Sequence, residues 1–392
     1  MSQHAAPAPS HTEAVVRVVD GNQLTPVIDG PAQLAALMAL IENARVSLRL
    51  YYYIFEADAS GTAVREALLD AINRGVTVSL IVDGFGSSAA PAAFFAPLQH
   101  AGCDFCRFLP RFGRRYLLRN HQKMAIADDG IAIIGGFNIS DDYFRPPEEG
   151  GWHDMGLEVK GPAVTWLVDY FEILARWTRE DKASIRSLRR ILREMSVSGG
   201  TLCWLLGGPT RRLSPWARSV KHDLDRARSA DMIEAYFSPG NAMLKRLRRI
   251  VKRGGRTRLV TAQISDNGAT IGAARFLYGG LLRGKVEIYE YRPTKLHMKL
   301  IVIDDATYIG SANFDMRSLF LNLELMLRIE DADFAALART FVDRELADCE
   351  RITLELHKAR AGFINRLKWA LSYLVVGVAD YTVTRRLNFG LD

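Results

Sequence analysis

Apolar and polar positions alternate along most of the chain in a way that predicts strands and amphipathic helices in regular succession. Apolar residues recur at helical spacing over 31–44, so this segment is expected to form a helix with one buried face. A strand over 46–55, a helix over 61–73 and a strand over 76–82 follow. This order and spacing predict a βαβ unit, in which the two strands run parallel.

The second half of the chain repeats this order. Strands are expected at 231–237, 258–263 and 286–291, with helices at 241–252 and near 270–282 between them. This internal duplication predicts an α/β protein made of two fused units related by a pseudo-two-fold axis. Each unit would bring its own sheet to a shared seam.

Each half also carries the same short motif. Residues 120–138 read NHQKMAIADDGIAIIGGFN, and residues 296–313 read LHMKLIVIDDATYIGSAN. A histidine, a lysine and an aspartate recur at the same spacing and an asparagine closes each copy: His121, Lys123, Asp128 and Asn138, then His297, Lys299, Asp304 and Asn313. Two similar hairpins with surface histidines would not account for the repeated lysine and asparagine.

The spacing within the motif suits phosphate chemistry. In a strand, side chains alternate with period two, so the histidine and the lysine point to the same face. A nucleophilic nitrogen beside a fixed cation is what attack on a phosphate diester requires. A further apolar strand with one acid follows each copy, with Asp154 in HDMGLEV and Glu324 in NLELMLRI.

These motifs resemble those of the phospholipase D superfamily, whose duplicated His-Lys-Asp motifs meet in one active site. Within it, the sequence is most similar to bacterial cardiolipin synthases that lack an N-terminal membrane domain. The resemblance covers residues 30–356, and the finer match rests on YYYIFEADASG at 51–61, NHQKMAIADDGIAIIGGFNISDDYF at 120–144, LEVKGPAV at 157–164, AYFSPGNAML at 235–244 and GSANFDMRSLFLNLE at 310–324. It implies two fused phospholipase D-like α/β/α repeats with the active site at their seam.

The resemblance also implies roles for the motif residues. One histidine attacks phosphorus and the other handles the proton of the alcohol, with His121 implied as the nucleophile. The acid on the later strand orients a histidine, so Asp154 would pair with His121 and Glu324 with His297. The lysines, Asn138 and Asn313 would hold the phosphate oxygens.

The histidine, lysine and aspartate of both motifs form the candidate catalytic set. Within it, Asp128 and Asp304 look more structural, because they lie further along the motif strands and could brace the hairpins. The first copy has Gly136 where the superfamily usually has serine, and related synthases share this glycine. The expected chemistry needs no cofactor or metal, and the sequence holds no metal-ligand cluster beyond the motifs.

Charge and cysteine content indicate the class of partner and the cellular location of the protein. The chain has 392 residues and a net charge of +7, which favours anionic partners such as a membrane surface or nucleic acid. Four cysteines are too few for a disulfide scaffold, and no signal peptide or apolar run long enough to span a bilayer is visible. We therefore expect a cytoplasmic protein at the inner face of the cell membrane.

Charge and apolar patterning also divide the chain. We expect a disordered N-terminal tail at 1–28, a first repeat at 29–177, a basic linker at 178–228 and a second repeat at 229–356. An amphipathic C-terminal tail at the membrane surface is expected at 357–392. The tail could instead dock on the core.

The leading functional hypothesis is a phosphatidyltransferase that makes cardiolipin from phosphatidylglycerol. A phospholipase D that uses water as acceptor could be built from the same residues, because the acceptor depends on how dry the pocket is. A nuclease is a further alternative that net charge alone would allow, although small nucleases of this superfamily usually carry one motif per chain. A membrane-surface scaffold without activity would not explain six intact motif residues. We therefore expect phospholipid, and no nucleic acid, as partner.

Overall fold

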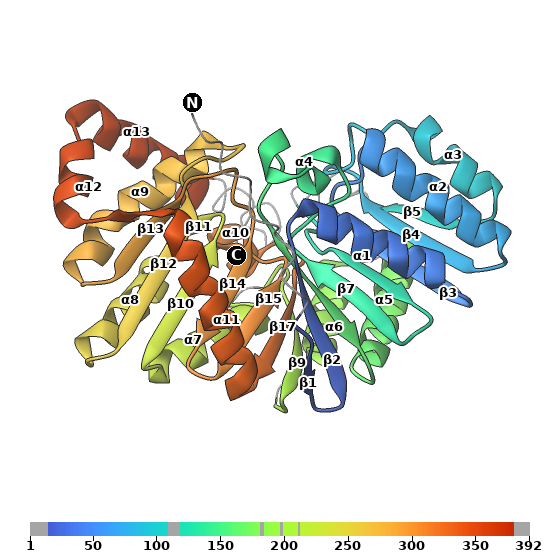
Figure 1. The fold of residues 1–392 in the computed structure, drawn as a ribbon, viewed down its shortest axis with the longest axis horizontal. Coiled ribbons are helices and arrows are strands. Elements are labelled where there is room, and N and C mark those ends of the chain that lie inside the picture. Colours follow the sequence, from blue (N-terminus) through green and yellow to red (C-terminus); the bar gives the residue numbers. More distant parts are fainter. Residues whose placement is uncertain (1–14, 109–117, 181–183, 197–198, 211, 380–392) are drawn as a thin grey trace, which may run out of the picture.

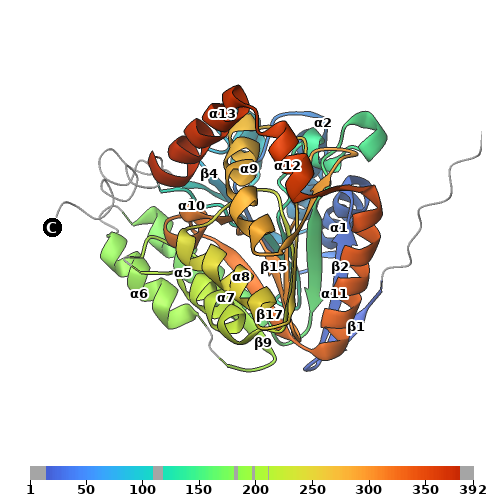
Figure 2. The ribbon, with the colours of Figure 1, turned by 90° about the vertical axis from the view of Figure 1, so that its left-hand side faces the viewer.

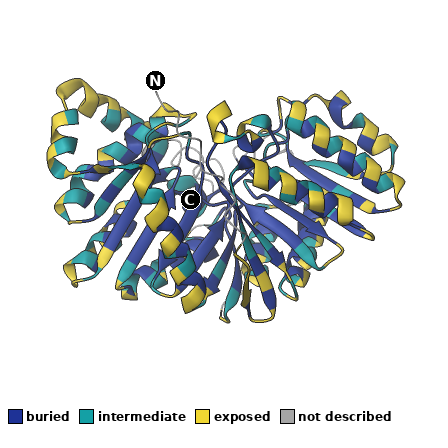
Figure 3. Ribbon diagram, in the orientation of Figure 1, coloured by how far each residue is buried: buried dark blue, intermediate teal, exposed yellow. Residues whose placement is uncertain are grey.

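The computed structural model describes residues 15–108, 118–180, 184–196, 199–210 and 212–379. These residues form two eight-stranded sheets that lie side by side, with helices on their faces (Figure 1). Most strand residues are buried, while the helices carry the exposed positions (Figure 3). The α/β architecture of two similar units is therefore confirmed.

The first sheet has the strand order β1-β2-β8-β7-β6-β3-β4-β5. Its strands are β1 (Arg17–Val19), β2 (Asn22–Ile28), β3 (Ser47–Tyr52), β4 (Thr77–Asp83), β5 (Asp104–Phe108), β6 (Met124–Ala127), β7 (Ile131–Gly135) and β8 (Met155–Lys160). The connecting helices are α1 (Gly30–Asn43), α2 (Ala59–Asn73), α3 (Ala92–His100), α4 (Asp141–Phe144) and α5 (Val164–Arg179).

The second sheet has the order β18-β13-β12-β10-β14-β15-β17-β9. Its strands are β9 (Leu202–Leu206), β10 (Ser229–Glu234), β12 (Arg256–Ala262), β13 (Glu287–Tyr291), β14 (Lys299–Ile303), β15 (Ala306–Gly310), β17 (Leu325–Glu330) and β18 (Cys349–Ile352). The helices are α6 (Ile185–Met195), α7 (Pro215–Arg226), α8 (Asn241–Lys252), α9 (Gly268–Arg283), α10 (Met316–Phe320), α11 (Ala332–Glu345), α12 (Leu354–Arg360) and α13 (Phe363–Tyr373).

Strand pairing shows the duplication directly. In the first unit β3 runs parallel to β4 and antiparallel to β6, which carries the first motif. In the second unit β10 runs parallel to β12 and antiparallel to β14, which carries the second motif. Each motif strand therefore lies in the interior of its sheet, where neighbours on both sides fix its position.

Local sequence signals explain where several helices begin. The Asp29 carboxylate accepts the N–H of Ala32 at 3.0 Å, and Pro31 stands in the first turn of α1. The Asp58 carboxylate accepts the N–H of Gly61 at 2.8 Å and starts α2 in the same way. These caps satisfy N–H groups that a helix cannot satisfy from within.

Two of the expected segment boundaries are wrong. Residues 15–28 do not belong to a disordered tail, because β1 and β2 lie there and β2 pairs with β8; residues 1–14 lie outside the described residues. The segment 178–228 is not a linker either, since β9 pairs with β17 and completes the second sheet. The short apolar run LCWLL within this cation-rich segment supplies β9.

The C-terminal segment is folded against the second unit. The ring of Tyr373 on α13 stacks on Phe276 of α9 with 4.9 Å between centroids, and Trp369 stacks on His357 at 5.3 Å. Figure 2 shows α13 lying along α9. The described part of the expected tail, up to residue 379, thus packs on the protein, and 380–392 lie outside the described residues. Within the described ranges, no helix is long and apolar enough to cross a membrane.

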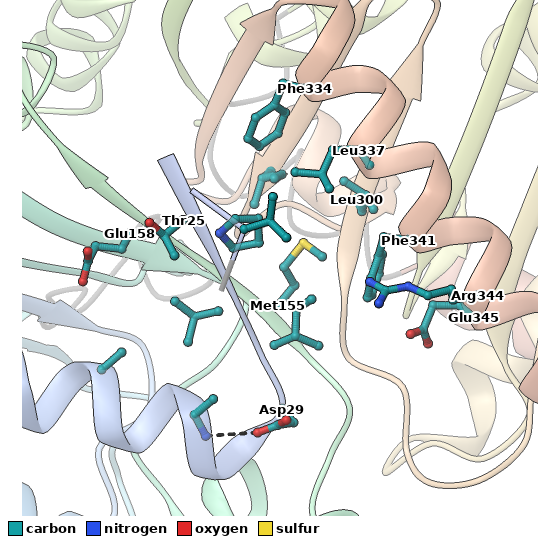
Figure 4. Close-up of a pocket in the computed structure, with 18 of the residues that line it drawn as sticks. Thr25, Asp29, Met155, Glu158, Leu300, Phe334, Leu337, Phe341, Arg344 and Glu345 are labelled. Atoms are coloured by element: carbon teal, nitrogen blue, oxygen red, sulfur yellow. Dashed lines mark hydrogen bonds between the residues drawn. The ribbon is translucent and has the colours of Figure 1, made fainter. Parts of the chain in front are cut away.

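A cavity of about 620 Å³ opens between β2 and α11, at the junction of the two units (Figure 4). Its walls are mainly apolar and include Met155, Leu300, Phe334 and Phe341. Neither motif histidine nor motif lysine is among the described residues that line it, so this cavity is distinct from the candidate active site.

Candidate active site

The two motifs meet because each one is hydrogen-bonded to the opposite unit. The backbone N–H of His121 donates to the carbonyl of Leu323 at 2.9 Å, and the N–H of His297 donates to the carbonyl of His153 at 2.8 Å. Leu323 directly precedes Glu324, and His153 directly precedes Asp154. These bonds place the acid of each unit beside the histidine of the other.

The pairing of acids and histidines is therefore the reverse of the expected one. His121 Nδ1 lies 3.1 Å from Glu324 Oε2, and His297 Nδ1 lies 2.6 Å from Asp154 Oδ2. The expected pairs, Asp154 with His121 and Glu324 with His297, are wrong. They followed the order of the chain within each repeat, whereas the side chains of Asp154 and Glu324 reach across the seam to the histidine of the other unit.

The partners of the histidines fix which ring nitrogen is free. His121 Nδ1 faces two acceptors, the Glu324 carboxylate and the carbonyl of Ser311, each at 3.1 Å. Nδ1 must therefore carry the hydrogen, which leaves the Nε2 lone pair available. The 2.6 Å contact of His297 Nδ1 with the Asp154 carboxylate places the hydrogen on Nδ1 in the same way, and Nε2 of His297 then faces Lys299 Nζ at 3.1 Å. Both rings are prepared for chemistry at Nε2.

The Glu324 carboxylate is fully buried and held by several donors. Ser311 Oγ donates to Oε2 at 2.6 Å and Ser318 Oγ donates to Oε1 at 2.8 Å. Burial raises the pKa of Glu324, but His121 and the other partners outweigh burial and hold the pKa below its usual value. Glu324 thus stays ionised and keeps the ring of His121 in place.

Gly136 stands at the motif position where the superfamily usually has serine, and the lack of a side chain there has a steric reason. A Cβ atom at this position would lie 2.5 Å from Oδ1 of Asp154, so any side chain would displace the carboxylate that holds His297. The second unit has Ser311 at the matching position, and its hydroxyl instead donates to Glu324. The two acid sites are therefore built differently although the units share one fold.

The motif lysines are buried beside the histidines. Lys123 Nζ donates to the carbonyl of His121 at 2.5 Å, and Lys299 Nζ lies 3.1 Å from His297 Nε2. Burial lowers the pKa of both lysines, and a phosphate anion bound beside them would favour their charged form. The side-chain Nδ2 of Asn138 and Oδ1 of Asn313 are buried without a hydrogen-bond partner among the described residues.

Asp128 and Asp304 lie away from the reacting groups. Asp128 accepts backbone N–H groups of Arg45, Val46 and Ser47 at 2.7 to 2.9 Å, and Asp304 accepts the N–H of Ser229 at 2.8 Å. At about 3.3 Å per strand residue, each aspartate is roughly 20 Å from the histidine of its motif. These contacts agree with the expected structural role, in which the two aspartates brace the far ends of the motif strands.

Sequence reasoning did not identify the aromatic residues around the histidines. The Tyr53 ring meets His121 edge-on with 5.0 Å between centroids. Tyr143, Trp152 and Tyr236 surround His297 at 5.1, 5.5 and 6.1 Å, and the Tyr143 hydroxyl lies 3.5 Å from its Nε2. Each of these aromatic residues lies in or beside a segment that the sequence analysis quotes. Because they do not recur at a fixed spacing in both halves of the chain, the sequence did not identify them as site residues.

Two buried acids were also missed. Burial raises the pKa of Asp83 to about 6, and its carboxylate accepts the N–H of Asn120, the residue before His121, at 2.9 Å. Glu234 is buried near Lys299, accepts the N–H of Phe314 at 3.1 Å, and has a pKa raised by burial. Asp83 is the last residue of β4, and Glu234 is the last residue of β10. The turn residues after Asp83 were the only sequence signal near either acid.

The histidine pKa shifts predict loss of stability in acid. Burial, followed by Lys299, lowers the pKa of His297 from 6.5 to about 4, so between these values the unfolded chain binds a proton that the folded protein does not. The free energy of unfolding should therefore fall as pH falls from about 6.5 to 4. Urea denaturation of the wild type and of His297→Asn across this range would measure the contribution. Parallel curves for the two proteins would contradict it.

Comparison with solved structures supports the duplicated fold. The phosphatidylserine synthase of Haemophilus influenzae Rd KW20 superposes with a TM-score of 0.73 over 96% of this chain and 97% of that chain, at 12% identity. The polyphosphate kinase of Porphyromonas gingivalis gives a TM-score of 0.55 over 86% of this chain and 49% of that chain, at 16% identity. At these identities the likeness concerns the fold alone.

Sequence comparison gives the family. The cardiolipin synthase A of Pseudomonas putida (strain W619) is 30% identical over 344 residues, which cover 85% of this chain and 70% of that protein. The cardiolipin synthase A of Pseudomonas aeruginosa (strain LESB58) is 29% identical over 85% of this chain and 69% of that protein. Residues 37–174 and 220–345, more than half of the chain, match the family described as cardiolipin synthase, PLD-like domain. The chain therefore belongs to the cardiolipin synthase family with phospholipase D-like domains.

Proposed function

We propose that this protein is a phosphatidyltransferase that joins two molecules of phosphatidylglycerol into cardiolipin and releases glycerol. The observation that carries the proposal is the pair of histidines at one seam. Each has its Nδ1 held by a buried carboxylate and a buried lysine beside it. The names of the similar curated proteins support the same substrate class.

In the first step, Nε2 of His121 attacks the phosphorus of one phosphatidylglycerol. The P–N bond forms while the bond to the glycerol oxygen breaks, and His297 gives that oxygen a proton from Nε2. His297 must enter this step in its protonated form, which the anionic phosphate bound beside it would favour over the neutral form of the empty site. The assignment to His121 is supported by access, since its side chain is 13% exposed and that of His297 is 5% exposed. Glycerol then leaves, and a phosphatidyl group stays on His121.

In the second step, a hydroxyl of another phosphatidylglycerol takes the place of glycerol. His297, now neutral, accepts the hydroxyl proton while the oxygen attacks phosphorus and the P–N bond breaks. Cardiolipin forms, His121 is restored and His297 carries the proton needed for the next cycle. The two histidines thus exchange roles between steps, and no external acid or base is consumed.

The lysines and asparagines would stabilise the charge that shifts on phosphorus. Lys123 and Lys299 are buried and have lowered pKa values, so they gain most from an anionic phosphate between them. The Nδ2 of Asn138, which has no partner among the described residues, could donate to one of the remaining phosphate oxygens, and Asn313 would have to donate through its own Nδ2. This leaves Asp154 and Glu324 as positioning residues, which fix the rings without touching the substrate.

The choice of a lipid alcohol over water is supported by the surroundings of His297. Tyr143, Trp152 and Tyr236 pack around its ring and limit the room for water at Nε2. Because the substrates are lipids and the chain is basic, we also propose peripheral contact with the inner face of the cell membrane. Nucleic acid is not part of the proposed reaction.

The direct test is mass spectrometry of the lipids formed when purified full-length protein is incubated with phosphatidylglycerol vesicles. Cardiolipin and free glycerol in equal amounts are expected. Phosphatidic acid without cardiolipin would make water the acceptor and overturn the transferase assignment. The His121→Ala protein, purified in parallel, controls for a contaminating lipase because it should form neither product.

A further inference from the structure

Helix α13 and the π-helical segment that follows it, Leu374–Ala379, carry a row of exposed apolar side chains. Six side chains leave at least half of their surface in solvent: Phe363, Ile364, Leu367, Leu371, Leu374 and Val375. We refer to these six residues as the α13 stripe. The opposite side of the helix rests on α9 through Tyr373 and Phe276, so the stripe faces away from the protein.

The stripe has the form of an interfacial helix. Its members within α13 recur at i, i+1, i+4 and i+8, which places them within roughly 100° of the helix circumference. Two exposed cations, Arg366 and Lys368, lie on either side of this sector. An apolar sector bordered by cations suits the boundary between acyl chains and anionic head groups.

Two exposed apolar residues lie at equivalent turns of the two units. Phe85 follows the end of β4 by two residues, and Ile264 follows the end of β12 by two residues. Because β4 and β12 occupy the same position beside β3 and β10, the two turns are related by the duplication. Turns related in this way lie at the same end of their sheets.

Each of these turns is connected to one of the catalytic histidines. The guanidinium of Arg119, two residues before His121, lies 3.7 Å from the centroid of the Phe85 ring. On the other side, the Tyr236 hydroxyl donates to Asp266, two residues beyond Ile264, and the Tyr236 ring meets His297 edge-on. Phe85 and Ile264 therefore lie on the two sides of the histidine pair, and we infer that the opening to the site lies between them.

The α13 stripe lies at this same end of the molecule. Helix α9 begins at Gly268, directly after the turn that carries Ile264, and α13 packs along it. Figures 1 and 2 both show α13 at the upper edge of the second unit. The stripe thus extends the apolar surface outward from the opening of the site.

We propose that the α13 stripe, Phe85 and Ile264 together form the face that docks on an anionic phospholipid bilayer. The inference rests on the proposed function, because it places the opening of the site against the lipid surface. Apolar side chains would enter the head-group region while Arg366 and Lys368 meet lipid phosphates. The substrate could then remain in the bilayer and raise only its head group to the histidines.

A bilayer fits this face better than a second copy of the chain does. A symmetric dimer through the stripe would bring Arg366 and Lys368 of both copies together, and the whole chain already carries a net charge of +7. Anionic lipid supplies charge of the opposite sign. Charge complementarity therefore selects the lipid surface.

The test replaces Leu367 and Leu371 by glutamate in the full-length protein and measures co-sedimentation with phosphatidylglycerol vesicles. We expect binding to fall by about tenfold or more, since two apolar contacts are lost and two like charges are added. The matched control is Val16→Glu with Val18→Glu, two exposed valines near β1 at the lower edge in Figure 1. The control should bind as the wild type does.

Two further measurements separate docking from catalysis. The Leu367→Glu, Leu371→Glu protein should keep its activity on monomeric short-chain phosphatidylglycerol, whereas His121→Ala should bind vesicles normally without forming product. If no protein forms product, the proposed function fails while the vesicle result still decides the docking face. Unchanged vesicle binding by the α13 variant overturns the inference, and loss of a dimer in sedimentation velocity would then assign the face to a second copy.

Hydrogen exchange can test the orientation without any substitution. Bound vesicles should slow exchange in peptides covering 363–376, 84–88 and 263–268. Peptides covering 15–22, at the opposite end of the molecule, should exchange at an unchanged rate. Protection confined to 15–22 or to the helices of the first unit would contradict the proposed face.

Discussion

Turnover of phosphatidylglycerol is expected to fall by about 10⁴-fold or more when either His121 or His297 is replaced by alanine. The physical reason differs between the two. Without His121 no P–N bond can form, and without His297 the departing glycerol oxygen receives no proton. Initial rates of cardiolipin formation, measured by mass spectrometry, would test both variants, and unchanged circular dichroism would show that each still folds.

The two histidines can be told apart with a substrate whose leaving group needs no proton. A phosphatidyl ester of p-nitrophenol should react with the His297→Ala protein in a single burst, because His121 can still attack. The second step needs His297 as base, so the phosphatidyl group should remain on the enzyme and raise its intact mass. His121→Ala should give neither the burst nor the added mass.

The reverse pattern would reassign the nucleophile. A burst from His121→Ala and none from His297→Ala would mean that the more enclosed histidine attacks phosphorus. Substantial steady turnover by either variant would contradict a shared two-histidine site. Loss of the added group in acid, with the glycerophosphoryl part retained in base after the acyl esters are cleaved, would identify a phosphoramidate rather than an ester.

The spacing of the motifs predicted the centre of the site because strand geometry translates directly into side-chain direction. His121 and Lys123 lie just before β6, and His297 lies just before β14, which begins at Lys299. The extended chain there keeps the period-two alternation that places both members of a pair together. The duplication of βαβ units could also be predicted from the sequence, because apolar residues recur with a period of about two in strands and about 3.6 in helices. These features depend on neighbours in the sequence.

The pairing of acids and histidines could not be predicted in this way. It depends on the hydrogen bond from His121 to Leu323 and on the one from His297 to His153, which join residues far apart in the chain. Likewise, β9 was not predicted as a sheet strand. It lies in a cation-rich segment, and its place in the sheet depends on pairing with β17, which is distant in the sequence. Gly136 could be interpreted only once Asp154 was placed against it.

The crossed pairing itself predicts that each acid controls the histidine of the other unit. Glu324→Gln should lower the pKa of His121 further, because the Glu324 carboxylate raises it, and should leave His297 nearly unchanged. Asp154→Asn should lower the pKa of His297 and spare His121, because the Asp154 carboxylate raises the His297 pKa. NMR titration of ¹³C-labelled histidine rings, assigned with the alanine variants, measures both values.

Activity and tautomer provide a second readout of the same pairing. Each amide variant should lose about 10²-fold or more in kcat, because the ring whose Nδ1–H has lost its carboxylate no longer holds Nε2 toward phosphorus. The ¹⁵N shifts of that ring alone should move toward a mixture of tautomers. If Glu324→Gln disturbed His297 and spared His121, the pairing would follow the order of the chain within each repeat, and the positioning roles of Glu324 and Asp154 would have to be exchanged.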